Sequence, residues 1–126
     1  MDRVPPMLFA VDVASIEGET ILTLRGELDL YAQPRFMAAL AGIDDGATRV
    51  VLDLSELAFI DCANIDIIHR VWMLAGLRGT EVVLRSPSAH VLRVMEITGL
   101  LLNVGDDEGR PIVVTQPSAA FERAVV

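Results

Sequence analysis

The sequence predicts an α/β fold: a mixed, mostly parallel β-sheet of about five strands with about four helices, opened by an antiparallel hairpin. Two observations carry this prediction. Stretches rich in strand-forming residues alternate with stretches of helical periodicity, and the first two strand-like stretches follow one another directly. Strands that alternate with helices form a largely parallel sheet against which the helices pack. The 126 residues fit one domain, residues 1–126, and leave no room for a second.

The opening hairpin is expected at residues 8–14 and 20–25, where strand-forming residues alternate in polarity. Residues 17–19, Glu-Gly-Glu, form the turn between them. A helix follows, because Pro34 suits a first helical turn and Gly42 suits the position just after the last one.

The centre of the chain predicts two buried strands with a helix between them. Residues 50–52 are a short apolar run with β-branched side chains, as in a strand covered on both faces, and residues 57–60 lead on to Asp61. From about Cys62 the apolar residues recur with a helical period, and residues 81–85 form the next buried strand.

The last third of the chain predicts a helix, a strand and a final short helix. Residues 86–87, Ser-Pro, are expected to be a cap and a first-turn proline, and Gly99 is expected to end that helix. The last strand lies either near residues 101–104 or at residues 112–114, and Gln116 opens the final helix.

Composition excludes several classes of function. The formal net charge is −8, and an acidic surface repels phosphate backbones and anionic lipids, so neither nucleic acid nor a membrane is an expected partner. All ten basic residues are arginine, which rules out every mechanism that needs a lysine. No secretory signal or membrane span is visible. Cys62 is the one cysteine, so no internal disulfide can form, and the cytoplasm is the simplest location.

No catalytic, metal or cofactor site is expected. The chain has no Gly-rich phosphate loop and no nucleophile with a placeable histidine base. His69 and His90 lack metal-spaced ligands and are interpreted as structural, and Trp72 as packing. The acidic residues 106–108 lack the ligand spacing of a calcium loop and are interpreted as a solvated turn. The sequence therefore predicts a protein that is not an enzyme.

Two turns mark the edge where a site is expected, because ligands and partners of such sheets gather where strand ends meet helix N-termini. Residues 26–30 precede the first helix and residues 59–64 precede the second. Asp61 is expected to cap the second helix by accepting a backbone N–H two or three residues later. Asp29 either contacts a partner or stabilises the start of the first helix.

Three motifs in order resemble the STAS domain family, and specifically bacterial anti-sigma factor antagonists. Residues 24–35 contain the Gly-Glu-Leu-Asp signature, residues 50–61 resemble the central strand with its following loop, and residues 86–100 resemble the third helix and its stop. The likeness covers about residues 8–125 and implies a single STAS domain with the STAS fold.

The resemblance also implies a mechanism. In this family the loop after the central strand usually reads Asp-Ser-Ser-Gly or Asp-Ser-Thr-Gly. Its first hydroxyl is phosphorylated by a partner that is both kinase and anti-sigma factor, an ATPase of the histidine-kinase-like type. The unphosphorylated domain binds that partner and frees a sigma factor. In this chain Asp61 matches, Cys62 takes the phosphoacceptor position, Ala63 the second hydroxyl and Asn64 the glycine. Regulation by phosphorylation at Cys62 is therefore not expected.

The residues expected to bind the partner lie on the two turns and are Asp29, Leu30, Tyr31, Asp61, Cys62, Ala63 and Asn64. Cys62 is either a redox sensor at a helix N-terminus or, as the favoured interpretation, a small half-buried residue without special reactivity. Since the phosphoacceptor is missing, a ligand-sensing, signal-sensing or scaffolding STAS module without a sigma-factor role is the alternative function. The oligomeric state stays open between monomer and dimer.

Overall fold

The computed structural model describes residues 8–98 and 113–114. In chain order its elements are β1 (Ala10–Ile16), β2 (Glu19–Leu28), α1 (Gln33–Ala41), β3 (Arg49–Ile60), α2 (Cys62–Leu77), β4 (Glu81–Arg85), α3 (Ala89–Ile97) and β5 (Val113–Val114). They form one sheet in the order β1-β2-β3-β4-β5. The pairs β2–β3 and β3–β4 are parallel, and the outer pairs β1–β2 and β4–β5 are antiparallel.

The predicted mixed sheet with an opening antiparallel hairpin is thus confirmed. The hairpin turns at Glu17 and Gly18, which both have positive φ, 45° and 84°. The strand expected at residues 112–114 is present as β5, and α1 ends before Gly42 as predicted. The helix expected from Gln116 onward lies outside the described residues.

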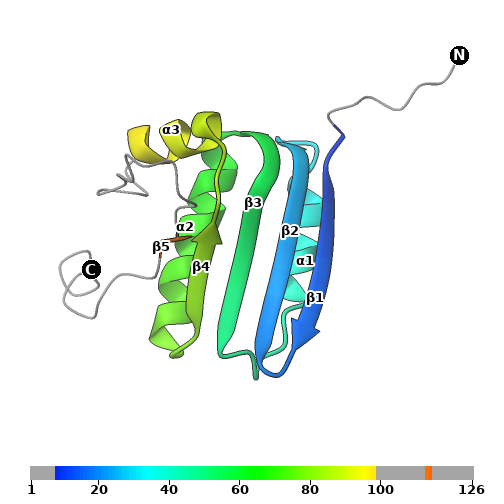
Figure 1. Ribbon diagram of the computed structural model, residues 1–126, viewed down its shortest axis with the longest axis vertical. Coiled ribbons are helices and arrows are strands. Elements are labelled where there is room, and N and C mark those ends of the chain that lie inside the picture. The colour runs from blue at the N-terminus through cyan, green and yellow to red at the C-terminus, as the bar shows by residue number, and fades with distance from the viewer. Residues whose placement is uncertain (1–7, 99–112, 115–126) are drawn as a thin grey trace, which may run out of the picture.

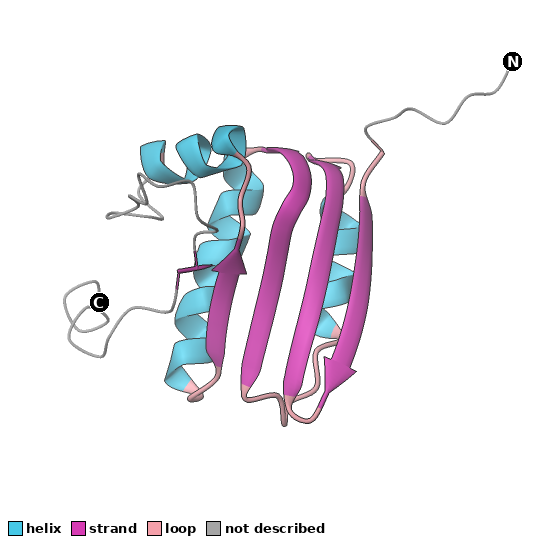
Figure 2. Cartoon of the chain, in the orientation of Figure 1, coloured by secondary structure: helices cyan, strands magenta, loops and turns pink. Residues whose placement is uncertain are grey.

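The helices α1 and α2 cover one face of the sheet, and α3 lies across one end (Figure 1). Figure 2 shows the same layers, with the strands in front and these two helices behind them. Along β2, Leu22 and Leu24 are buried while their neighbours are more exposed, so alternate residues point toward the helices. The core also includes side chains from β3 and from all three helices, among them Leu52, Phe36, Ile68, Trp72, Val91 and Met95.

The opposite face of the sheet carries two rows of charged side chains. Arg25 of β2 pairs with Asp12 of β1 and with Glu56 of β3, which raises the pKa of Arg25 above its ordinary value. Arg49 of β3 contacts Glu19 of β2 at 3.2 Å and Glu81 of β4 at 3.2 Å. Each row therefore spans three neighbouring strands. Since all these side chains are partly solvent-exposed, each pair contributes little stability by itself.

Two details differ from the sequence-based expectations. Residues 50–52 and 57–60 belong to one continuous strand, β3, whose pairing with β2 is interrupted by register shifts. The cap of α3 is also not Ser86: Ser88 occupies that position, and its Oγ accepts a hydrogen bond from the Val91 N–H at 3.3 Å. Ser86 instead has a φ of 52° and turns the chain out of β4.

The three helices that the structure describes have 9, 16 and 9 residues. The longest, α2, has 16 residues and runs beside β4. No helix in the described ranges combines the length and apolar character that crossing a bilayer requires.

Candidate partner-docking site

The three helices begin at the same end of the sheet, where β2, β3 and β4 end (Figure 1). This edge contains both turns singled out in the sequence. The β2–α1 loop is formed by residues 29–32, and the β3–α2 turn is centred on Asp61. The topology thus brings together two segments that are about thirty residues apart in the chain.

Asp61 caps α2 as predicted. Its backbone is extended, with φ −92° and ψ 169°, and its Oδ1 accepts a hydrogen bond from the backbone N–H of Asn64 at 2.9 Å. This bond satisfies one of the N–H groups that every helix leaves without a partner in its first turn. The cap therefore fixes the direction in which α2 leaves the sheet.

Asp29 stabilises the start of α1 in a similar way. Its Oδ1 accepts a hydrogen bond from the Ala32 N–H at 3.0 Å, and its backbone carbonyl accepts one from the Gln33 N–H at 3.1 Å. Asp29 therefore stabilises the start of the first helix, which is one of the two roles that the sequence left open. Contact with a partner stays a prediction for this residue.

Asn64 joins the two segments. Its Nδ2 lies 3.2 Å from the Leu28 carbonyl oxygen, 3.2 Å from that of Asp29, and 2.8 Å from Asp61 Oδ1. All three partners are acceptors, so the amide nitrogen must face them. The Asp61 N–H also donates to the Leu28 carbonyl oxygen at 3.2 Å. One side chain thereby holds the end of β2 against the start of α2.

The burial of Asn64 corrects its expected role. Its exposed fraction is 0%, so it cannot touch a partner directly and acts on the surface only by positioning it. Its Oδ1 has no hydrogen-bond partner within the described part of the chain. An unpaired buried acceptor costs free energy, so the hydrogen bonds of Nδ2 must outweigh this cost to keep Asn64 in its buried position.

The outer surface of this edge is apolar and open. Leu30 and Tyr31 have exposed fractions of 66% and 89%. Cys62 and Ala63 are exposed in the first turn of α2. The half-buried position expected for Cys62 is therefore wrong, because the cap at Asp61 turns the first residue of the helix outward. Tyrosine is one of the residue types that most often contribute the binding energy of a protein interface, so Tyr31 is the strongest candidate anchor of this edge.

Two neighbouring features extend the edge, and the sequence analysis missed both. A hollow of about 210 Å³ lies beside Tyr31 and is lined by Phe9, Glu27 and Arg35, among others. On the other side, the rings of Phe59 and His90 stack with centroids 6.1 Å apart. Each feature joins residues from different elements, so no local sequence pattern could have indicated it.

The described residues hold no group of three or more His, Cys, Asp or Glu side chains that could ligate a metal ion. His69 lies edge-on to Trp72, with ring centroids 6.5 Å apart, and His90 stacks on Phe59. These contacts agree with the structural interpretation of both histidines.

Comparison with known proteins identifies the family. The chain belongs to the STAS domain family: the family model described as "Mlab, STAS domain" matches residues 11–101. The anti-sigma-B factor antagonist of Bacillus subtilis is 22% identical over 90 residues, which cover 71% of this chain and 83% of that protein. BtrV of Bordetella bronchiseptica, provisionally named an anti-sigma factor antagonist, is 36% identical over 88 residues, 68% of this chain and 75% of BtrV.

Two solved structures share the fold. An anti-sigma factor antagonist from Mycobacterium paratuberculosis superposes with a TM-score of 0.64 at 24% identity, covering 97% of both chains. The antagonist SpoIIAA in its unphosphorylated form gives a TM-score of 0.59 at 26% identity, covering 72% of this chain and 82% of SpoIIAA. The STAS fold expected from the sequence is thereby confirmed. None of these four proteins is named as an enzyme.

Proposed function

We propose that this chain is an anti-sigma factor antagonist that binds a kinase-type anti-sigma factor and so releases a sigma factor for transcription. The observation that carries the proposal is the edge where Leu30 and Tyr31 stand exposed beside Cys62 and Ala63, with Asn64 holding the two segments together. The names of the related proteins support the same role.

The chemistry of the edge suits a protein partner. Leu30 and Tyr31 supply apolar area that becomes buried in a complex, and the backbone around them is held by hydrogen bonds before binding. A surface that is ordered in advance loses less conformational entropy on association. The net charge of −8 favours a partner with a basic face, which would raise the association rate.

Position 62 determines how this binding is controlled. A phosphate on the first residue of α2 would add nearly two negative charges within the interface. A thiol accepts no phosphate under ordinary kinase chemistry, so Cys62 keeps the edge in its unphosphorylated, binding-competent form. Control of binding then lies elsewhere, for example in the amount of protein present.

The proposal is tested with the anti-sigma factor captured from the native host and then purified. In calorimetric titrations, Cys62→Glu places a permanent charge at the edge and should weaken binding by about tenfold or more, which is ~1.4 kcal/mol. Leu77→Glu is the matched control, because Leu77 is also exposed, with an exposed fraction of 73%, and lies at the far end of α2. Equal affinities of Cys62→Glu and the unmodified chain would disprove this interface.

The phosphorylation claim has its own measurement. The chain is incubated with the same anti-sigma factor and ATP, and its intact mass is recorded. We expect no added phosphate. A phosphate on Cys62 or on Ser55, whose hydroxyl donates to Asp53 Oδ1 at 2.8 Å, would overturn this part of the proposal.

A further inference from the structure

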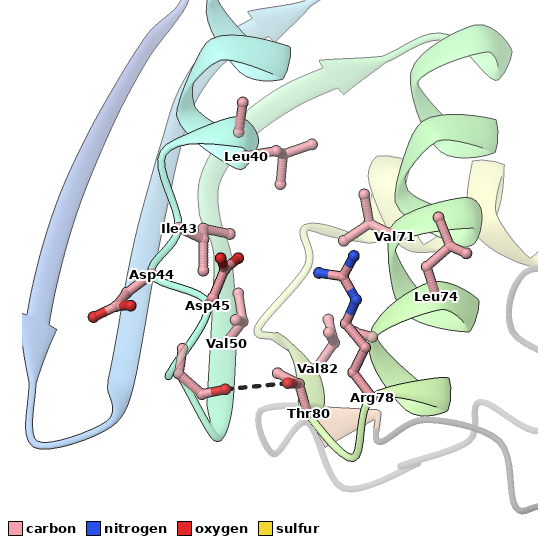
Figure 3. Close-up of a pocket in the computed structure, with 13 residues that line it drawn as sticks. Leu40, Ile43, Asp44, Asp45, Val50, Val71, Leu74, Arg78, Thr80 and Val82 are labelled. Atoms are coloured by element: carbon pink, nitrogen blue, oxygen red, sulfur yellow. Dashed lines mark hydrogen bonds between the residues drawn. The ribbon is translucent and has the colours of Figure 1, made fainter.

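A second concave site lies at the opposite end of the sheet from the docking edge. It is a hollow of about 280 Å³ between the end of α1, the loop that follows it, and the C-terminal half of α2 (Figure 3). Its floor is formed by Val50 and Val82, the first inward-facing residues of β3 and β4. Because it is separated from the edge by the length of the strands, it is not part of the proposed interface.

The walls of the hollow are aliphatic. Leu40 and Ile43 line the α1 side, and Val71 and Leu74 line the α2 side. Leu74 has an exposed fraction of 60%, so apolar surface is open to solvent at the rim. A concave surface that is lined mainly by apolar side chains and has a few polar groups is the usual character of a small-molecule site.

Two opposite charges flank the mouth. Figure 3 shows Asp45, on the α1 side, and Arg78, on the α2 side, with their charged ends turned toward the space between them. In the described part of the chain neither side chain forms an ion pair or a hydrogen bond, whereas five other ion pairs do form. Asp44 lies in the same loop, but Figure 3 shows its carboxylate turned away from this space, and its Oδ1 accepts a hydrogen bond from the Gly46 N–H at 3.0 Å. The mouth therefore presents one carboxylate, Asp45, that can bind a cation and one guanidinium, Arg78, that can bind an anion.

We propose that this hollow binds a small zwitterion with an aliphatic side chain, of the chemical class of leucine. The ligand ammonium contacts Asp45, its carboxylate contacts Arg78, and its alkyl group lies on Val50 and Val82. Size supports this class, because 280 Å³ is just below the range of about 300–1,000 Å³ that is typical of sites for drug-sized ligands. Charge supports it too, since one carboxylate and one guanidinium at the mouth match a ligand that carries one positive and one negative group.

The test compares three compounds with the same branched alkyl group: leucine, isocaproate, which lacks the ammonium, and isoamylamine, which lacks the carboxylate. A ligand that binds only the folded chain raises its melting temperature as its concentration rises. Leucine at millimolar concentration should raise the melting temperature and shift the methyl NMR signals of Val50, Val71 and Val82. The other two compounds should bind about tenfold more weakly.

Two exposed positions give matched variants that leave the core untouched. Arg78→Gln should remove the preference for leucine over isoamylamine, and Asp45→Asn should remove the preference for leucine over isocaproate. Three results would overturn the proposal: no leucine-dependent change in either readout, equal binding of all three compounds, or unchanged preferences in both variants. None of these measurements uses the anti-sigma factor, so failure here is distinct from failure of the proposed function.

Discussion

Removal of the Asn64 side chain tests the reasoning about the docking edge most directly. In Asn64→Ala the contacts of Nδ2 with Leu28, Asp29 and Asp61 are lost. An amide nitrogen carries two hydrogens, so two of the three contacts act as full hydrogen bonds at a time. The bond to the Asp61 carboxylate is worth roughly 1.5–3 kcal/mol and a bond to a carbonyl roughly 0.5–1.5 kcal/mol. Loss of the unpaired Oδ1 offsets part of this cost, so the expected decrease in unfolding free energy is about 2–4 kcal/mol.

The assay combines global and local measurements. Urea denaturation gives the unfolding free energy, and hydrogen exchange follows the backbone amides of Ala32, Gln33 and Asp61, which donate within the edge. These amides should exchange faster in Asn64→Ala than in a control with the same loss of global stability. Val82→Ala serves as that control, because Val82 is buried at the other end of the sheet.

A second variant separates the hydrogen bonds from the space that the side chain fills. Asn64→Asp keeps the size but replaces the donor with a carboxylate that faces three acceptors, so it should destabilise at least as much as Asn64→Ala. The reasoning is refuted if Asn64→Asp retains the full unfolding free energy. It is equally refuted if the three edge amides exchange in Asn64→Ala as they do in the Val82→Ala control.

Two further predictions concern the same edge. Asp61→Ala removes the cap of α2 and should lower the unfolding free energy by about 0.5–2 kcal/mol in urea denaturation; an unchanged midpoint would contradict the capping role. Tyr31→Ala removes a side chain that is 89% exposed, so the melting temperature should stay the same while affinity for the anti-sigma factor falls by about tenfold or more. A lower melting temperature with full affinity would show that Tyr31 serves the fold and not the interface.

Much of the fold follows from local patterns in the sequence. The hairpin, α1 with its early proline, the start of α2 at Cys62 and the strand Glu81–Arg85 all appear where periodicity and turn residues predict them. The cap of α3 shows the limit of such patterns. Ser86 and Ser88 are both plausible caps, and the structure uses Ser88, whose hydroxyl also donates to the Leu57 carbonyl oxygen on β3 at 3.2 Å. That contact depends on how α3 packs, which a local pattern does not contain.

In the candidate site, too, local features could be predicted from the sequence and tertiary contacts could not. Sequence analysis located both turns and the capping role of Asp61, because a strand end followed by a cap is a local signal. It did not find that Asn64 is buried or that Cys62 is exposed. The burial of Asn64 depends on its contacts with Leu28 and Asp29, which are more than thirty residues away in the chain. The sequence shows that Asn64 stands where the family usually has glycine. It does not show which backbone carbonyl groups the Asn64 amide contacts.

The two charged rows lie on the face of the sheet opposite α1 and α2, and they help to define which residues of neighbouring strands lie side by side. The strands β2, β3 and β4 are joined by helices and not by tight turns, so no turn fixes their alignment. Sliding β3 by two residues would keep the alternation of its side chains, so alternation alone does not exclude that alignment. The same slide would move Arg49 from its place between Glu19 and Glu81 and set it beside the aliphatic side chain of Ile21 or beyond the end of β2. Surface ion pairs that add little to the stability of the sheet thus favour one alignment over others that share the same alternation of side chains.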